Sequence, residues 1–410
     1  MQTTRRIFLR DSALAMAGIG AAPAWLARAA EAPGSRKKIL VALFQRGAAD
    51  GLNMVVPFQE TSYYQMRPAI AVPAPGKAGG AIDLDGRFGL HPELAPFQGL
   101  WDKGHLAIVP ACGSPDQTRS HFDAQDYMES GTPGRKSTRD GWLNRAILNS
   151  PQNGIDPNRK ISPVRAVALG SRMPRTLRGE ASAVAVSNLG DFQVRQQEAA
   201  GMLESMYARA GDKELSGAGK DTFAAIKLVE GINQKSYTPS GGASYPRGRL
   251  GPSMEQIARL IKADVGLEVA FADMGGWDHH TGEGNQLPGM LREFSSAIDA
   301  FVTDLGDRME DVVLVTMSEF GRTARENGNG GTDHGHGGVM FVVGGNIKGG
   351  KVYGRWPGLE REQLHEGRDL AVTTDFREVL ADLVSGHLGQ SNVERVFPGF
   401  QRSGGGLRLL

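Results

Sequence analysis

Residues 38–44 read KILVALF, and residues 45–53, which follow directly, read QRGAADGLN. A short, almost wholly apolar run that ends in glycines is typical of a strand buried on both faces of a parallel sheet. Six further apolar runs share this character: Leu106–Ala111, Ala166–Leu169, Ala183–Val186, Leu267–Ala272, Val312–Met317 and Val339–Val343. We therefore expect a buried sheet whose first strand is Lys38–Phe44.

The segments between these runs have the spacing of helices. Apolar residues recur every three or four positions in Phe122–Met128, Gly141–Leu148, Val194–Ala208, Thr222–Ile232, Met254–Ile261, Leu291–Leu305 and Asp375–Leu388. Strands that alternate with helices indicate an α/β fold, a mostly parallel sheet with helices on both faces. Residues 149–251 are rich in Gly, Pro and Ser, and we interpret them as an insertion or cap on one domain that spans residues 31–400. Residues 401–410 are expected to form a Gly-rich tail.

The composition narrows the class of protein. The chain has 410 residues, 40% of them hydrophobic, which is enough to bury a large core. Its formal net charge is +1 with no long basic run, which argues against nucleic acid as the main partner. Cys112 is the only cysteine, so a disulfide within the chain and a site built from clustered thiolates are both excluded.

The first thirty residues are typical of an export signal. Arg5 and Arg6 precede Ile7-Phe8-Leu9, a mild apolar stretch runs from Ala13 to Ala22, and Ala27-Arg28-Ala29 is a small-x-small cleavage site. This pattern predicts a twin-arginine signal at residues 1–30, recognised by the Tat export machinery. The apolar stretch is shorter than the roughly 20 residues that a membrane span needs. We expect a mature chain that is periplasmic or secreted and has no transmembrane anchor.

Polar residues gather just after the predicted strands and just before the last one. The metal-ligand candidates are Asp50, Asp278, His280, Glu319, His334 and His336. Ligands of α/β sheets bind at the carboxyl ends of the strands, so these side chains are expected to converge at one edge. Imidazoles and carboxylates without thiolates suit one or two divalent ions, Zn²⁺ or Mn²⁺, and two ions could clamp the attacking and leaving oxygens of a transferred group. Taken singly, each motif could equally be a solvated turn, a helix cap or an ion-pair partner.

The motifs together resemble a known family. The chain looks like the exported bacterial proteins called domain of unknown function 1501 (DUF1501), which are similar to the alkaline phosphatase–sulfatase superfamily. The resemblance rests on Asp50-Gly51 after the first strand, Thr118-Arg119-Ser120-His121 entering a helix, Asp278-His279-His280, Ser318-Glu319-Phe320-Gly321, and His334 with His336 before a strand. It implies an alkaline phosphatase-like fold and a metal-dependent hydrolase of phosphate or sulfate-type esters, with a small-molecule or polymer substrate.

Two departures from the superfamily pattern matter. Phe320 stands where the superfamily usually has a metal-binding histidine, so one metal site is expected to be incomplete or to borrow His279. The sulfatase pattern C-x-P-x-R is also absent around Cys112, which disfavours chemistry of that type. Phe320 therefore favours an alternative function, a non-catalytic metal- or ligand-binding relative with a surface or assembly role.

The resemblance and the charges suggest roles for the remaining candidates. Thr118 is either the nucleophile or a plain helix N-cap, with Ser120 as the second candidate nucleophile. Arg119 is expected to act in catalysis, and Arg322 in substrate binding, by neutralising anionic ester oxygens. Asn53 is expected to contact the substrate. His121 is expected to be a metal ligand, a substrate contact or simply a packed helix residue.

Overall fold

The central sheet is built around the first apolar run of the chain. The structure, a computed structural model, describes residues 37–150, 161–192, 213–234, 236–402 and 404–410. Strand β1 (Ile39–Arg46) lies in the middle of the sheet and pairs in parallel with β8 (Val269–Gly275) and β9 (Val312–Ser318). The elements described below all lie in one compact unit, Lys38–Leu410.

The remaining strands extend the sheet on both sides of this centre. The strand order is β11-β5-β10-β9-β1-β8-β6-β7. The outer strands are β5 (Leu106–Gly113), β6 (Ala166–Leu169), β7 (Val184–Val186), β10 (Gly338–Gly344), β11 (Lys351–Val352) and β12 (Thr374–Asp375), the last of which pairs with β5. Strand β10 is antiparallel to both β9 and β5, and the other pairs are parallel. The predicted mostly parallel sheet is confirmed.

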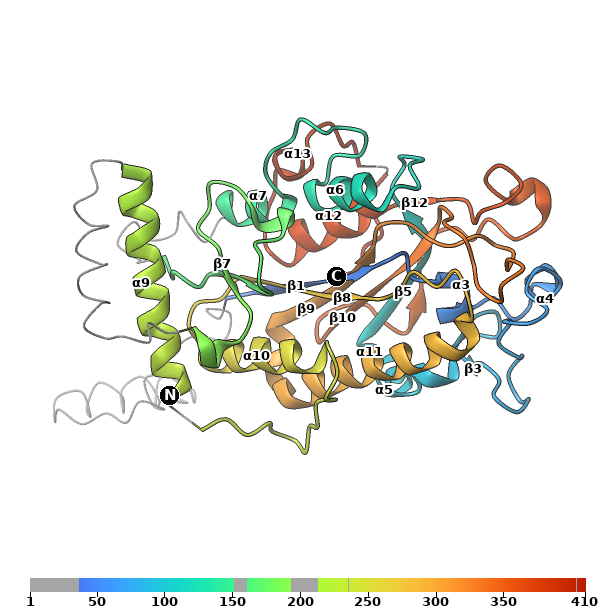
Figure 1. Ribbon diagram of the computed structural model, residues 1–410, viewed down its shortest axis with the longest axis horizontal. Helices are drawn as coiled ribbons and strands as arrows, with labels where there is room; N and C mark the ends of the chain where they lie inside the picture. The colour runs from blue at the N-terminus through green and yellow to red at the C-terminus, as the bar shows by residue number, and fades with distance from the viewer. Residues whose placement is uncertain (1–36, 151–160, 193–212, 235, 403) are drawn as a thin grey trace, which may run out of the picture. The chain divides into compact units, whose positions relative to one another are not determined.

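Helices cover both faces of this sheet, as the sequence pattern predicts (Figure 1). One face is covered by α5 (Pro96–Asp102), α10 (Gly251–Lys262) and α11 (Glu283–Leu305). The other is covered by α6 (His121–Ser130), α7 (Trp142–Leu148), α12 (Phe376–Gly386) and α13 (Val393–Val396). Alternate side chains of β1 enter opposite cores: Val41 and Leu43 pack in the first, and Ala42 and Phe44 in the second. Because β1 is apolar on both faces, it can only be a central strand.

Smaller elements complete the chain. A three-stranded sheet in the order β2-β4-β3 contains β2 (Val55–Val56), β3 (Ile82–Asp83) and β4 (Gly89–Leu90). The remaining helices are α3 (Gly51–Met54), α4 (Thr61–Met66) and α9 (Lys213–Asn233), with short 3₁₀ turns at Pro92–Leu94, Arg175–Leu177, Leu189–Asp191, Gly306–Asp311 and Arg361–Gln363. Among the described residues, no helix combines the length and apolar character that a membrane crossing requires.

Most expected elements appear within a few residues of their predicted bounds. The main differences are two early helix starts: α9 begins at Lys213, ahead of the expected Thr222, and α11 begins at Glu283, ahead of the expected Leu291, and includes Pro288. Within the stretch expected to be a cap, β6 and β7 add two strands to the main sheet. The end of the Gly-rich tail is packed, since Leu409 is buried and its amide donates to Asp382. The predicted signal at residues 1–30 and the predicted helix Val194–Ala208 lie outside the described residues.

Candidate metal centre

Four segments distant in the sequence meet at one edge of the sheet. Asp278 follows the end of β8, Glu319 follows β9 directly, and His121 begins the helix after β5. Because β10 runs antiparallel, its start lies at the same edge, and this brings in His334. The carboxyl ends of the parallel strands therefore carry the candidate residues, as expected for an α/β sheet.

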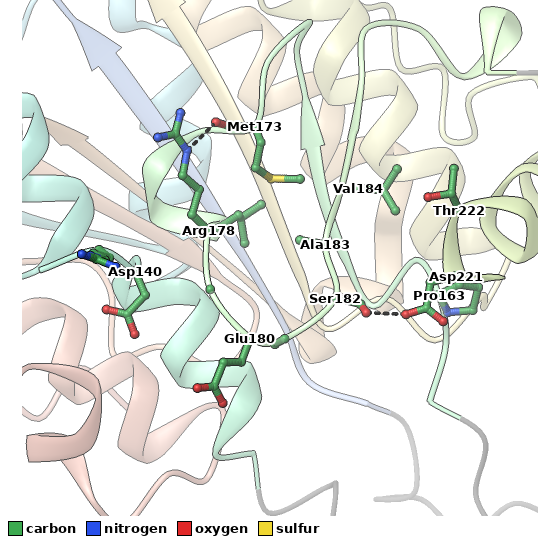
Figure 2. Close-up of a pocket in the computed structure, with 14 residues that line it drawn as sticks. Asp140, Pro163, Met173, Arg178, Glu180, Ser182, Ala183, Val184, Asp221 and Thr222 are labelled. Carbon is green, nitrogen blue, oxygen red and sulfur yellow. Dashed lines mark hydrogen bonds between the residues drawn. The ribbon is translucent and has the colours of Figure 1, made fainter. Parts of the chain in front are cut away.

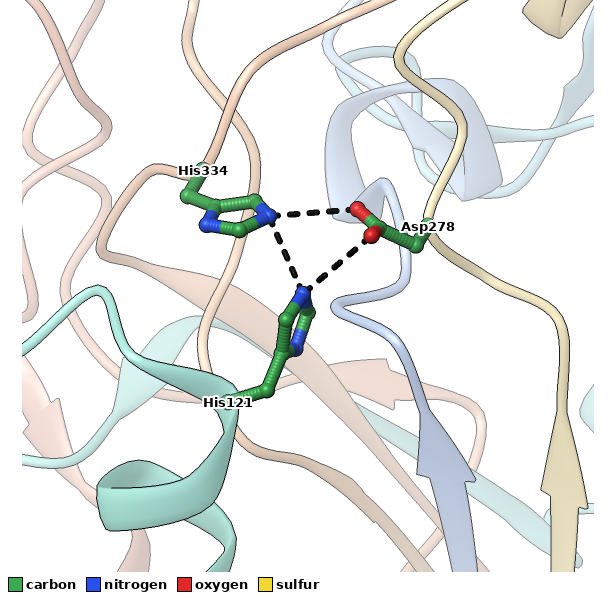
Figure 3. Close-up of side chains that lie close together, drawn as sticks. All are labelled: His121, Asp278 and His334. Carbon is green, nitrogen blue, oxygen red and sulfur yellow. Dashed lines mark hydrogen bonds and ion pairs between the residues drawn. The ribbon is translucent and has the colours of Figure 1, made fainter.

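The central group consists of two imidazoles and a carboxylate (Figure 3). Nε2 of His121 lies 3.0 Å from Nε2 of His334 and 3.3 Å from Oδ2 of Asp278, and Nε2 of His334 lies 3.2 Å from Oδ1 of Asp278. A third imidazole joins them, since Nε2 of His280 lies 3.0 Å from both Asp278 Oδ1 and His334 Nε2. The Asp278 side chain is 42% exposed, so the group is open to solvent and to a ligand.

The opposite nitrogen of each imidazole is held by an acceptor. Nδ1 of His121 lies 2.8 Å from Glu319 Oε1, Nδ1 of His280 lies 3.1 Å from Asp333 Oδ1, and Nδ1 of His334 lies 2.9 Å from the carbonyl oxygen of Arg119. Carboxylate and carbonyl oxygens only accept, so we infer that each Nδ1 carries the hydrogen and each neutral ring presents a lone pair at Nε2. Nε2 of His334 lies 3.0 Å from Nε2 of both His121 and His280, and lone pairs this close repel unless a cation lies between them. An imidazole whose Nδ1 donates to an oxygen while its Nε2 is available to an ion is typical of metal-binding histidines.

Glu319 supports this group from behind. Its side chain has no exposed surface, and its Oε1 accepts from His121 Nδ1, from Gln125 Nε2 at 2.9 Å and from the Gly47 amide at 2.9 Å. Burial would raise the pKa of Glu319, but the hydrogen bonds from His121 and Gln125 hold it below its usual range. The same hydrogen bond from Glu319 raises the pKa of His121. Glu319, expected to be a ligand, therefore acts through His121.

Arg322 positions Asp278 and does not face the substrate side. It is 2% exposed, its Nη1 donates to Asp278 Oδ1 at 2.7 Å, and its other donors are taken by the hydroxyl and carbonyl of Thr332. Burial would raise the pKa of Asp278, and Arg322 keeps it below its usual range. The expectation that Arg322 contacts substrate does not fit this geometry, because its hydrogen-bonding groups are already satisfied inside the protein.

Phe320 packs directly against the imidazoles. Its ring centroid lies 5.0 Å from that of His121 and 5.0 Å from that of His334. His279, which could have replaced the missing histidine, is buried, and burial lowers its pKa.

Within the described ranges, one group of three or more metal-ligand residues converges within 4.8 Å: His121, Asp278 and His334. The geometry therefore fits one ion rather than two.

Asp50 and Asn53 belong to a separate buried network. Arg67 holds both carboxylate oxygens of Asp50, and the Asp50 side chain also caps α3. The amide of Asn53 donates to Glu283 Oε1 at 3.1 Å, and its oxygen accepts from Tyr63. These satisfied contacts leave Asp50 outside the imidazole group and Asn53 closed to a substrate. Burial and the Asp50 charge raise the pKa of Glu283 well above its usual range.

The remaining candidates lie around the imidazole group but do not join it. His336 stacks on His365 with ring centroids 4.5 Å apart, and burial lowers the pKa of His336 to about 4. The Arg119 guanidinium is bound by Glu366 at 2.8 Å and by Asp369 at 2.7 Å, and these two carboxylates hold it away from the imidazole group.

The two candidate nucleophiles differ in their contacts. Ser120, and not Thr118, occupies the N-cap position of α6, and its side chain makes no capping hydrogen bond. The hydroxyl of Thr118 accepts from the Ser120 amide at 3.2 Å. Ser120 is exposed and directly precedes His121. Its hydroxyl is therefore the more available of the two.

Sequence reasoning missed three supporting residues. Asp333, which orients His280, directly precedes His334 in the sequence, so the motif itself contained this signal. Gln125 lies one helical turn after His121, a spacing that places both on one face of α6. Gly47 (φ +120°) lets the loop after β1 approach the Asp278 segment, since a Cβ there would lie 2.7 Å from the Asp278 amide nitrogen. Gly47 is thus required by a close backbone approach.

A cavity with no residue of this group lies elsewhere in the described chain. It measures about 1010 Å³ and runs along β7, lined by Arg178, Glu180, Ser182 and Asp221 among others (Figure 2). None of the residues that line it belongs to the imidazole group. Its size therefore does not identify it as the reacting site.

The chain matches one protein family and is similar to several solved structures. Residues 37–396 match the family described as "Protein of unknown function (DUF1501)". Curated protein sequences give no match. Among solved structures, the PH0037 protein of Pyrococcus horikoshii has 12% identity and a TM-score of 0.36, with 87% of this chain and 98% of that chain covered. PsFucS1 sulfatase of Pseudoalteromonas sp. has 11% identity and a TM-score of 0.35, with 98% of this chain and 75% of that chain covered.

A third solved structure is an alkaline phosphatase of the bacterium TAB5 with Mg bound. It has 13% identity and a TM-score of 0.31, and 75% of this chain and 91% of that chain are covered. At such identities a function does not transfer between proteins, so any activity has to be argued from the side chains of the site.

Proposed function

The chain belongs to the DUF1501 family, and on this premise we propose that it is an exported metal-dependent hydrolase of phosphate or sulfate-type esters. The observation that carries the proposal is the convergence of three imidazole Nε2 atoms on one exposed carboxylate. His121, Asp278 and His334 would hold a single divalent ion, and His280, whose Nε2 lies 3.0 Å from both Asp278 and His334, would be its fourth ligand. Three nitrogen ligands and one oxygen ligand suit Zn²⁺ or Mn²⁺.

The residues around the group have separate tasks in this proposal. A bound divalent ion would supply Lewis acidity toward an anionic ester oxygen. The N-terminus of α6, which begins at His121, favours negative charge at the same place. Ser120 is the first candidate for the attacking hydroxyl and Thr118 the second. Glu319 fixes the ring of His121, and Arg322 fixes the carboxylate of Asp278.

A second function is favoured by one observation. Phe320 packs on His121 and His334, where the superfamily would have a further metal-binding histidine. A chain with one ion and no second site could bind a ligand without turning it over, in a surface or assembly role. Both functions share the metal, and ester turnover separates them.

Metal content and ester turnover of the purified mature chain test the proposal. We expect about one equivalent of Zn or Mn by elemental analysis, and a loss of most of it in His280→Ala and in Asp278→Ala. His105→Ala, a histidine outside the group, is the matched control and should keep the metal. Turnover of phosphate or sulfate monoesters that disappears in Asp278→Ala supports the hydrolase. Metal without turnover across such a panel supports the binding role, and a chain without metal contradicts both.

Export is the part of the proposal that rests on sequence alone. Arg5 and Arg6 lie in residues 1–30, the proposed Tat signal, and the mature chain would act in the periplasm or outside the cell on a small-molecule or polymer ester. The substrate itself follows from neither the family nor the metal ligands.

A further inference from the structure

A cleft of about 540 Å³ borders the metal centre. Two of its lining residues contact histidines of the imidazole group, one at a ring and one at the backbone. Asp333 holds His280 through its Nδ1 at 3.1 Å, and the Arg368 guanidinium donates to the carbonyl oxygen of His334 at 2.9 Å. The cleft and the metal centre therefore share a wall, and a ligand at one extends naturally into the other. Its volume suits a group the size of a sugar ring or two.

The lining of this cleft is strongly charged. Arg325, Arg361 and Arg368 contribute guanidinium groups, and Glu326, Glu360 and Asp333 contribute carboxylates. The carboxylates are used by the protein itself. Glu326 accepts from the amides of residues 69 and 70 at 3.0 Å, Glu360 accepts from Ser62 and takes part in a capping box, and Asp333 accepts from His280 and Asn327.

The arginines, in contrast, keep donors available. Arg325 and Arg361 are exposed and form no ion pair within the part of the chain that the structure describes. Arg368 uses one nitrogen on the His334 carbonyl and lies 3.6 Å from Asp369 through another. A guanidinium matches the planar or tetrahedral oxygens of carboxylate, sulfate and phosphate with two parallel hydrogen bonds. The cleft thus offers free anion donors beside carboxylates that are already satisfied.

We propose that this cleft is a subsite for a second anionic group of the substrate. The inference rests on the proposed function, and it narrows the substrate class to esters that carry at least two anionic groups, such as a sugar with two phosphate or sulfate substituents. One anionic group would lie at the metal centre, and its neighbour would be bound by Arg325 and Arg361.

Binding of a matched pair of probes tests the subsite. Glucose 1,6-bisphosphate and glucose 6-phosphate differ by one anionic group, and calorimetry on the mature chain measures both. We expect the bisphosphate to bind at least tenfold more tightly. In Arg325→Gln/Arg361→Gln this preference should fall below threefold, while the affinity for glucose 6-phosphate and the metal content stay unchanged. Arg292→Gln/Arg308→Gln, which removes two guanidiniums outside the cleft, is the control and should keep the preference.

Three results would overturn the subsite: no preference in the unmodified chain, a preference that survives in the Arg325/Arg361 variant, or an equal fall for both probes. Both substituted side chains are exposed, so the variant should fold, and its thermal midpoint verifies this. The metal measurement keeps the two proposals apart. If the chain holds no metal but the bisphosphate preference depends on these arginines, the proposed hydrolase fails and the anion subsite stands.

Discussion

Replacing Glu319 with Gln removes the negative charge behind His121 while keeping the size of the side chain. The Oε1 atom of Glu319 accepts three hydrogen bonds, from His121, Gln125 and the Gly47 amide, so a glutamine must place its carbonyl oxygen there. Its amide group then faces Ser318 Oγ, which lies 3.1 Å from Oε2 and can accept. The hydrogen bonds survive in this arrangement, and the charge does not.

The expected effect falls on metal affinity more than on stability. A carboxylate that accepts from the far nitrogen of a metal-binding imidazole makes the ligating nitrogen more basic, and losing such a partner typically costs 10–100-fold in affinity, or about 1.4–2.7 kcal/mol. The free energy of unfolding of the metal-free chain should fall by only about 1–2 kcal/mol, because the hydrogen-bonding groups stay satisfied.

Competition with a chelator of known affinity measures the metal binding, and urea unfolding of the metal-free chain measures stability. Glu268→Gln is the matched control, because Glu268 is also buried but pairs with Arg165 at 2.8 Å. It should lower stability and leave metal affinity unchanged. Unchanged affinity in Glu319→Gln, or an equal loss in both variants, would refute the role we give to Glu319.

Three further outcomes follow from the structure. Arg67→Met leaves the buried carboxylate of Asp50 without its cation, and we expect a loss of about 3–5 kcal/mol in urea unfolding, so a loss below about 1 kcal/mol would contradict the paired arrangement. Burial lowers the pKa of His387 to about 4, so between about pH 6.5 and 4 the unfolded chain binds a proton that the folded chain does not. The free energy of unfolding should fall by up to about 3 kcal/mol as the pH drops through this window. His387→Gln should make the free energy of unfolding less dependent on pH, and an unchanged pH profile in this variant would contradict the role given to His387. Finally, Arg5→Lys/Arg6→Lys should leave the precursor in the cytoplasm, because the export receptor reads paired guanidinium groups, and normal export of that variant would show that the signal is misidentified.

The sheet could be predicted from the sequence because a strand that is buried on both faces consists almost wholly of apolar residues. The run Ile39–Phe44 is apolar throughout, and this argues against an edge position. The apolar pattern does not show whether a strand runs parallel or antiparallel to its neighbours. Val339–Val343 is as apolar as the neighbouring strands, but it runs antiparallel as part of β10. The start of α11 before Pro288 was missed for a related reason, since a proline within a helical pattern usually marks a boundary.

The residues of the site could also be predicted only in part. Asp278, His280 and His334 were predicted to be ligands from their residue types and their positions at strand ends, and the structure brings their side chains together. The roles of Glu319 and Asp50 depend on partners that the local sequence does not specify. Glu319 meets His121 across 198 positions, and Asp50 meets Arg67 across 17. A carboxylate after a strand looks the same whether it will bind a metal, an imidazole or a guanidinium.

The central position of β1 has a consequence for how the chain is made. Of the described strands, β1 is synthesised first. It pairs with β8 and β9, and the contact between Gln45 and Ser318 joins residues 273 positions apart. At roughly 5–20 residues per second, synthesis of the intervening chain takes roughly 14–55 s. For most of that time, until β8 has been synthesised, the run KILVALF has neither of its partner strands and is exposed to other nascent chains. A strand that is apolar apart from Lys38 is a site for aggregation in this condition, so the yield of folded protein should depend on whatever shields these seven residues until β8 and β9 have been synthesised.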